Sequence, residues 1–222
     1  MKYSILIPIY NEYSKLSSLK NELAYLKNND FQIIIIDDGS DDGSYQILKT
    51  FKNIELIRIN RNRGKGFAVK EGLNHVLNKN VILMDGDLEV KIKDLFRLIK
   101  SYKGYNACVG IRWNNILNKP IRLNKMGNYI TNTLFNILYK TKYIDILCCY
   151  KIISTKNLKS FKLKSNGFDL ETEIMAKLSL SNIHVKEILI TYNRRPANDG
   201  KKIKIYHIIK IIHRMLKTRW IS

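Results

Sequence analysis

The sequence is short of proline, cysteine and long apolar runs, and each shortage excludes a class of protein. Three prolines and eleven glycines among 222 residues exclude collagen-like and linker-dominated chains. The three cysteines are an odd number without metal-ligand spacing, and we expect buried free thiols, as in a cytosolic protein. No apolar run approaches the roughly 20 residues of a bilayer-spanning helix, so the chain is not expected to cross a membrane.

Acidic residues are also scarce, because 19 Asp and Glu face 39 Lys and Arg, giving a net charge of +20. Residues 1–111 carry 17 basic and 13 acidic side chains, whereas residues 112–222 carry 22 and 6. A field of this sign attracts the phosphates of nucleic acids, nucleotides or anionic lipids. A basic nucleic-acid-binding α/β protein is therefore one interpretation, and a lysine-rich proteome is the simpler source of many of these charges.

Short apolar runs alternate with helical periodicity in the first half of the chain. The runs predict strands at residues 3–9, 31–36, 54–59, 80–84 and 105–111, and the periodicity predicts helices at 14–28, 43–52, 65–78 and 91–102. Strands that are apolar throughout are typical of a parallel sheet covered by helices. We therefore predict an α/β fold with a mainly parallel sheet.

The second half does not continue this regular alternation of strands and helices. It predicts helices at 120–139 and 169–180, strands at 144–153 and 183–191, and a last helix at 203–218. No linker or repeat interrupts it, so we expect one domain at 1–202 and a basic amphipathic helix at 203–222.

The last helix combines apolar and basic residues. Helical spacing places six apolar residues on one face: Ile205, Ile208, Ile209, Ile212, Met215 and Leu216. Four basic residues lie largely away from it: Lys204, Lys210, Arg214 and Lys217. Such a helix can lie on an anionic membrane surface or pack against protein, and the sequence leaves both open.

Acidic and glycine-rich turns follow the predicted strands, where ligands bind in open α/β sheets. Asp85 and Asp87 follow a buried strand two residues apart, so they can share Mg²⁺ or Mn²⁺ with a diphosphate. The run DDGSDDGS at 37–44 is equally well explained as a turn and helix cap. Gly64 and Gly66 would let backbone approach a phosphate, or they only begin a helix.

Four segments in this order, SILIPIYNE, IIIIDDGSDDGS, NRGKGFAVKEGL and ILMDGDLE, resemble the nucleotide-sugar-binding half of inverting glycosyltransferases of family 2, which have the GT-A fold. Later segments, among them GIRWN, NGFDLETEI and ITYNRRPANDGKKI, look like the dolichyl-phosphate mannose synthase type and its bacterial relatives. Those enzymes move a sugar from a nucleotide diphosphate sugar to a polyprenyl phosphate. The resemblance covers about residues 3–205 and implies a metal-dependent hexosyltransferase.

The resemblance also implies roles for individual residues. The nucleoside would be held by Pro8, Tyr10, Glu12 and Asp38, with Lys65 in the loop near the base and ribose. The metal would be held by Asp85, Asp87 and Glu89. Phosphates would meet Arg112 and Arg122, and the lipid phosphate and leaving diphosphate would meet Arg195 and Lys201. Asp87, Arg112, Arg195 and Lys201 are the expected catalytic set.

The acceptor decides whether the reaction needs a base. A phosphate monoester is already anionic and needs no strong base, whereas an acceptor hydroxyl on a glycan or glycolipid does. Candidate bases are Asp145, Asp169, Glu171 and Glu173, of which Glu171 or Glu173 is preferred; the same residues can instead stabilise a helix N-terminus. We expect loss of transfer on replacing Asp87 with Ala and a dispensable Glu173.

Location and partners follow from the same resemblance. We expect a cytoplasmic protein, peripheral on the inner face of the membrane, that binds no nucleic acid. The sugar and the nucleotide base are left open.

Overall fold

The structure is a computed structural model in which residues 3–26, 31–102, 106–112, 123–193 and 205–221 are described, except the side chains of 123–126, 205–206 and 221. The strands are β1 (Tyr3–Ile9), β2 (Gln32–Asp37), β3 (Glu55–Arg58), β4 (Asn80–Leu83), β5 (Ala107–Ile111), β6 (Lys151–Ser154) and β7 (Val185–Leu189). The helices are α1 (Tyr13–Ala24), α2 (Ser44–Leu48), α3 (Lys65–Asn74), α4 (Lys93–Tyr102), α5 (Leu123–Tyr139), α6 (Thr155–Ser160), α7 (Leu170–Leu180) and α8 (Ile205–Ile221).

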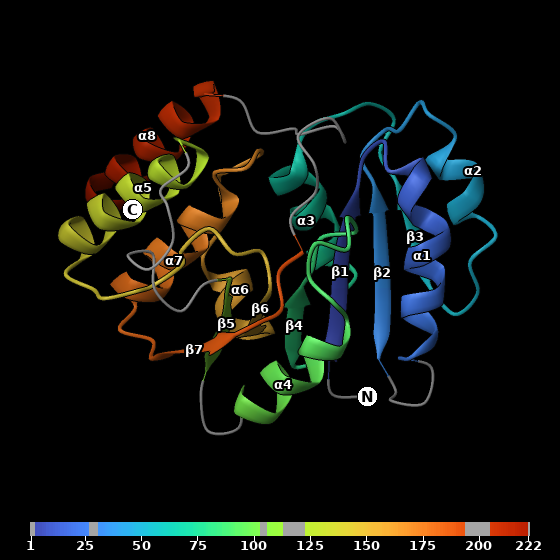
Figure 1. Cartoon of the computed structure of the whole chain (residues 1–222), viewed down its shortest axis with the longest axis horizontal. Helices are drawn as coiled ribbons and strands as arrows, with labels where there is room; N and C mark the ends of the chain where they lie inside the picture. Colours follow the sequence, from blue (N-terminus) through green and yellow to red (C-terminus); the bar gives the residue numbers. More distant parts are fainter. Residues whose placement is uncertain (1–2, 27–30, 103–105, 113–122, 194–204, 222) are drawn as a thin grey trace.

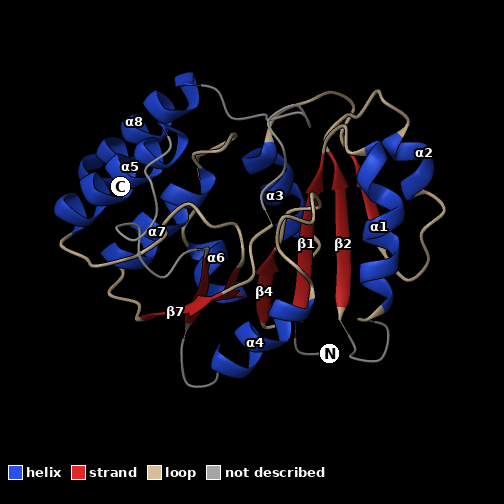
Figure 2. Cartoon of the chain, in the orientation of Figure 1, coloured by secondary structure: helices blue, strands red, loops and turns tan. Residues whose placement is uncertain are grey.

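The strands, drawn red in Figure 2, form one seven-stranded sheet in the order β3-β2-β1-β4-β6-β5-β7. β1 pairs in parallel with β2 and β4, and β5 pairs in parallel with β7. β6 is antiparallel to both of its neighbours, β4 and β5. The predicted α/β fold with a mainly parallel sheet is confirmed.

The first half folds as its apolar pattern predicts. Ile5, Ile34 and Ile82, in three neighbouring strands, are fully buried. Pro8 is tolerated inside β1 because β4 pairs only with residues 3–6, so this part of β1 has a partner strand on one side alone. Helix α1 lies on the near face of the sheet in Figure 1 and α3 on the far face.

The second half differs from the prediction in two places. The strand expected at 144–153 begins only at Lys151, because residues 144–150 form a loop whose backbone N–H groups bond to side chains from other elements. The short helix α6 was not predicted, since a six-residue helix shows little periodicity; its start is capped by the Ser154 hydroxyl, which accepts from the Asn157 N–H.

Helices α5, α7 and α8 lie together beyond the β5–β7 end of the sheet, on the opposite side of the molecule from α1 and α2 (Figure 1). The Tyr139 hydroxyl of α5 donates to the Met215 carbonyl of α8 (2.8 Å). Arg214 Nε of α8 pairs with Oδ2 of Asp169, the residue before α7 (2.9 Å). The last helix is thus packed on protein, while the predicted boundary at 202–203 lies outside the described residues.

The predicted apolar face of the last helix is only partly buried. Met215 is fully buried, whereas Ile209 and Leu216 are 66% and 40% exposed. Because two other helices flank α8, it buries one apolar stripe against them and presents another outward. None of the helices in the described parts of the chain is long and apolar enough to span a bilayer.

Candidate active site

The loops after β1 and β2 are hydrogen-bonded to each other at the carboxyl edge of the sheet. The Asn11 N–H donates to the Ser40 hydroxyl (3.0 Å) and the Glu12 N–H donates to the Ser44 hydroxyl (3.0 Å). The serines of the DDGSDDGS run therefore bind the neighbouring loop as well as serving the turn. Four residues predicted to hold a nucleoside lie on or near these loops: Pro8, Tyr10, Glu12 and Asp38.

Asp38 holds the loop that leads to α3. Its Oδ1 accepts from the Arg63 N–H (2.9 Å) and its Oδ2 from the Gly64 N–H (2.7 Å). Burial raises the pKa of Asp38 above its ordinary value, although these two donors oppose the rise. Asp38 therefore connects the predicted nucleoside site to the segment RGKG at residues 63–66 through these two hydrogen bonds.

Gly64 and Gly66 approach protein backbone at the start of α3, as in the alternative in which they begin a helix, and the phosphate contact stays a prediction. A Cβ at position 64 would lie 2.3 Å from the Asn166 carbonyl oxygen, and one at position 66 would lie 2.6 Å from the Ser165 carbonyl oxygen. The Phe67 N–H also donates to Asn166 O (3.2 Å). These glycines fix the start of α3 against residues 165–166.

Lys65, the first residue of α3, lies between two carboxylates, and its role near the base and ribose stays a prediction. Its Nζ is 2.6 Å from Asp85 Oδ1 and 2.5 Å from Glu171 Oε1. Although burial opposes the charged forms, the two carboxylates raise the pKa of Lys65, and Lys65 lowers the pKa of Asp85. Lys65 is therefore a fixed cation beside the predicted metal ligand.

Asp87 and Glu89 belong to a tight turn after β4. Leu88 takes a positive φ of 60°, unusual for this residue type, and the Glu89 N–H donates to Asp87 Oδ1 (3.1 Å). Glu89 Oε2 accepts from the Tyr192 hydroxyl (2.9 Å). The three predicted metal ligands thus share one loop, but their side chains have different protein partners.

The donor set suits an open cation site. In the described part of the chain, no three Cys, His, Asp or Glu side chains are arranged to hold a metal ion. Mg²⁺ and Mn²⁺ are commonly held by one or two carboxylates together with phosphate oxygens of a substrate. Asp85 and Asp87, two residues apart after β4, fit that arrangement. One oxygen of Asp85 also forms an ion pair with the Lys65 ammonium.

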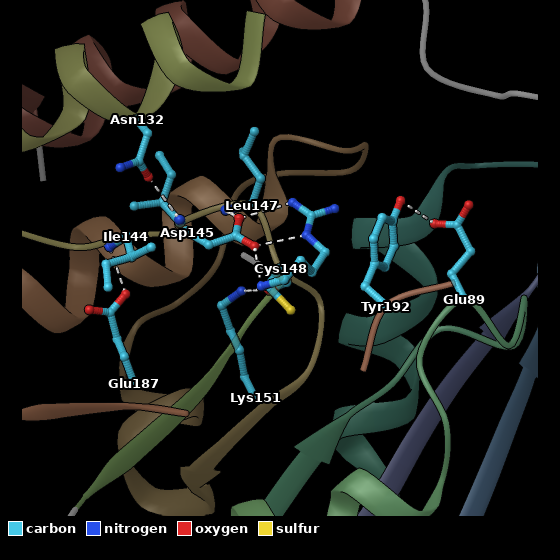
Figure 3. Close-up of polar contacts among 11 residues, drawn as sticks. Glu89, Asn132, Ile144, Asp145, Leu147, Cys148, Lys151, Glu187 and Tyr192 are labelled. Carbon is cyan, nitrogen blue, oxygen red and sulfur yellow. Dashed lines mark hydrogen bonds and ion pairs between the residues drawn. The ribbon is translucent and has the colours of Figure 1, made fainter. Parts of the chain in front are cut away.

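Arg112 follows β5 and is held through two hydrogen bonds by Asp145, which Figure 3 labels. Its Nε donates to Asp145 Oδ2 (2.8 Å) and its Nη2 to Asp145 Oδ1 (2.9 Å). The guanidinium carbon lies 5.3 Å from the centre of the Tyr192 ring. Burial disfavours its charge, but Asp145 keeps the pKa of Arg112 well above its ordinary value. Arg112 is a permanent cation fixed at the carboxyl edge of the sheet.

The other two predicted bases are also engaged. Asp169 pairs with Arg214, and Glu173 accepts from the backbone N–H groups of Lys164 (2.8 Å) and Ser165 (2.7 Å). Together with the Asp145 and Glu171 pairs, all four carboxylates proposed as bases have cationic or N–H partners. Glu173 was predicted to be dispensable for transfer. In the structure it binds the backbone at Ser165, against which Gly66 packs, so it has a structural role.

Two residues of this region were not predicted from the sequence. Lys151 is fully buried in β6, donates its ammonium to the Cys148 carbonyl, and has a pKa lowered by burial. Tyr192 connects Glu89 and Arg112. Tyr192 belongs to the quoted segment ITYNRRPANDGKKI, where only the basic residues were given a role, and a lysine inside an apolar run is a signal in the case of Lys151. Arg122, Arg195 and Lys201 lie outside the described residues, so their roles stay predictions.

Comparison with known proteins gives a family and relatives. The model of the family described as glycosyl transferase family 2 matches residues 4–161. Glycosyltransferase AglJ of Haloferax volcanii is 27% identical over 195 residues, which span 86% of this chain but 63% of AglJ. The dolichyl-phosphate beta-glucosyltransferase ALG5A of Trichomonas vaginalis is 26% identical over 234 residues, spanning 96% of this chain and 72% of that protein.

A solved structure shows the same fold. Glucosyl-3-phosphoglycerate synthase from Mycobacterium tuberculosis, in complex with Mn²⁺, uridine diphosphate and glucosyl-3-phosphoglycerate, superimposes with a TM-score of 0.77 at 14% identity. The match covers 100% of this chain and 81% of the other. With the family model matching most of the described sheet, the chain belongs to glycosyl transferase family 2.

Proposed function

We propose that this protein transfers a sugar from a nucleotide diphosphate sugar to a polyprenyl phosphate. The observation that carries the proposal is that all four carboxylates considered as bases have cationic or N–H partners. An acceptor hydroxyl would need a base, whereas a phosphate monoester is already anionic. The name of the dolichyl-phosphate relative supports the same acceptor class.

The reaction would be a single displacement with inversion. An oxygen of the lipid phosphate forms a bond to the anomeric carbon while the bond from that carbon to the nucleoside diphosphate breaks. Arg112 and Lys65 are fixed cations that would balance the charge of the departing diphosphate, and Asp38 with the β1 and β2 loops would hold the nucleoside. A Mg²⁺ or Mn²⁺ ion at Asp85 and Asp87 would supply further charge stabilisation.

The outer face of α5 and α8 would lie against the membrane that carries the acceptor. Six large apolar or aromatic side chains of these helices are exposed: Tyr129, Ile130, Ile137, Ile209, Leu216 and Trp220. Lys210 and Lys217 are exposed on the same helix as Trp220. Exposed apolar side chains beside lysines suit the interface of an anionic bilayer.

Replacement of Asp87 by Ala tests the proposed activity. We expect transfer of labelled sugar to a polyprenyl phosphate to fall at least about a hundredfold, because the variant loses a metal-binding carboxylate. Glu71→Ala, which removes a carboxylate from α3 (Lys65–Asn74), is the matched control and should retain wild-type transfer.

The acceptor class is tested in the same assay. Polyprenyl phosphate and glycolipid or oligosaccharide hydroxyls are offered in parallel, with a panel of nucleotide sugars and with or without Mn²⁺. Transfer to hydroxyls alone, or full activity of the Asp87 variant, contradicts the proposal.

A further inference from the structure

The segment that leads into the predicted lipid-phosphate loop is attached to the turn that holds the predicted metal ligands. The Asn193 N–H donates to the Glu89 carbonyl (2.8 Å), and Val90 and Tyr192 form an antiparallel bridge. The Thr191 N–H donates to Asp94 Oδ2 (2.9 Å). Two parts of the chain about a hundred residues apart are therefore joined beside the candidate site.

Tyr192 makes two further side-chain contacts at this junction. Its hydroxyl donates to Glu89 Oε2 (2.9 Å), and Figure 3 draws this bond as a dashed line. The guanidinium carbon of Arg112 lies over its ring, 5.3 Å from the ring centre. Arg112 is itself fixed by Asp145. One tyrosine thus touches a carboxylate of the metal turn with one end and the phosphate-binding arginine with its face.

We propose that Tyr192 is a positioning residue that orients Glu89 toward the metal-nucleotide and keeps Arg112 at the diphosphate. The inference rests on the proposed function and deepens it. A hydrogen bond to the carboxylate restricts its rotation, and the aromatic face stabilises the cation where it stands. The two contacts fix the positions of Glu89 and Arg112 relative to each other.

The two contacts can be separated by substitution. Tyr192→Phe removes the hydroxyl and keeps the ring under Arg112, whereas Tyr192→Leu removes both. We measure binding of uridine and guanosine diphosphates by calorimetry as Mn²⁺ is titrated, without an acceptor. Tyr192→Phe should raise the Mn²⁺ concentration for half-maximal binding about three- to tenfold and leave metal-free binding unchanged. Tyr192→Leu should weaken both.

A matched control separates positioning from stability. The Tyr102 hydroxyl donates to Asn80 Oδ1 at the same distance, 2.9 Å, but at the start of β4 and far along that strand from Asp85. Tyr102→Phe should leave the Mn²⁺ dependence unchanged. A Tyr192→Phe variant that behaves like Tyr102→Phe overturns the inference.

A double-mutant cycle tests whether the hydroxyl acts through Glu89. In a Glu89→Ala background the acceptor of the Tyr192 hydroxyl is gone, so Tyr192→Phe should change the Mn²⁺ dependence little. Effects of equal size in both backgrounds contradict the coupling. A wild-type protein that binds neither diphosphate with Mn²⁺ contradicts the proposed function itself, whereas normal wild-type binding with an unchanged Tyr192→Phe contradicts only the positioning role.

Discussion

Gly66 is required by the backbone that lies against it. A Cβ at this position would lie 2.6 Å from the Ser165 carbonyl oxygen and 2.9 Å from the Asn166 carbonyl carbon. Backbone cannot move aside as a flexible side chain can. The glycine therefore fixes the first turn of α3, and with it the place of Lys65 between Asp85 and Glu171.

Replacing Gly66 with Ala should destabilise the protein by about 1–3 kcal/mol, because the added methyl overlaps backbone. The measurement is the free energy of unfolding in urea. Gly127→Ala in α5 is the control, since among the described side chains its Cβ would meet only the end of Ile208, at 3.3 Å, and a helix favours alanine over glycine. Equal losses in both variants would show that backbone overlap at position 66 is not the cause.

Helix α7 connects three parts of the molecule through its first turn and the residue before it. Asp169 pairs with Arg214 of α8, Glu171 pairs with Lys65 of α3, and Glu173 holds the backbone at 164–165. Negative side chains at this end also favour the helix dipole. The element stabilises the site without contributing an unengaged base.

Arg214→Met should weaken the attachment of α8, because Asp169 loses its cationic partner. We expect a loss of roughly 1–3 kcal/mol at pH 7 and faster hydrogen exchange in α8. Lys217→Met, on the exposed side of the same helix, should leave both unchanged. Equal exchange rates in the two variants would contradict the role of the pair.

The same pair has a defined pH dependence. Burial raises the pKa of Asp169, but the hydrogen bonds from Arg214 and Ser165 and the charge of Arg214 together lower it, so the net pKa lies below the ordinary 3.8. A depressed pKa in the folded state gives stability that is complete above pH 3.8 and lost as pH falls through the lowered value. The difference between wild type and Arg214→Met should therefore shrink in that acidic range.

In the whole molecule, the excess positive charge and most of the carboxylates lie in different halves of the chain. The half that carries the acidic strand ends has nearly balanced charge, while residues 112–222 carry most of the excess of +20. The exposed apolar residues of α5 and α8 belong to the basic half. This combination suits a protein whose acceptor is a lipid phosphate in an anionic bilayer.

The double variant Ile209→Ser, Leu216→Ser should bind anionic phosphatidylglycerol vesicles about tenfold or more weakly, because two apolar side chains no longer enter the interface. Vesicle co-sedimentation measures it, and added salt should weaken wild-type binding as well. Tyr25→Ser, Leu77→Ser removes exposed apolar side chains from another part of the chain and is the control. Equal binding of both double variants would exclude α8 as the docking face.

The sequence by itself determined most elements, their order and the carboxylate turns after the strands, because these depend on local periodicity and turn chemistry. It also determined the family, since the motifs occur in a fixed order. Tertiary structure decided which groups meet: Lys65 with Asp85, Tyr192 with Glu89, and glycines with backbone. It also divided the apolar residues of α8 into buried and exposed stripes. These outcomes depend on contacts between segments far apart in the chain, which local patterns do not encode.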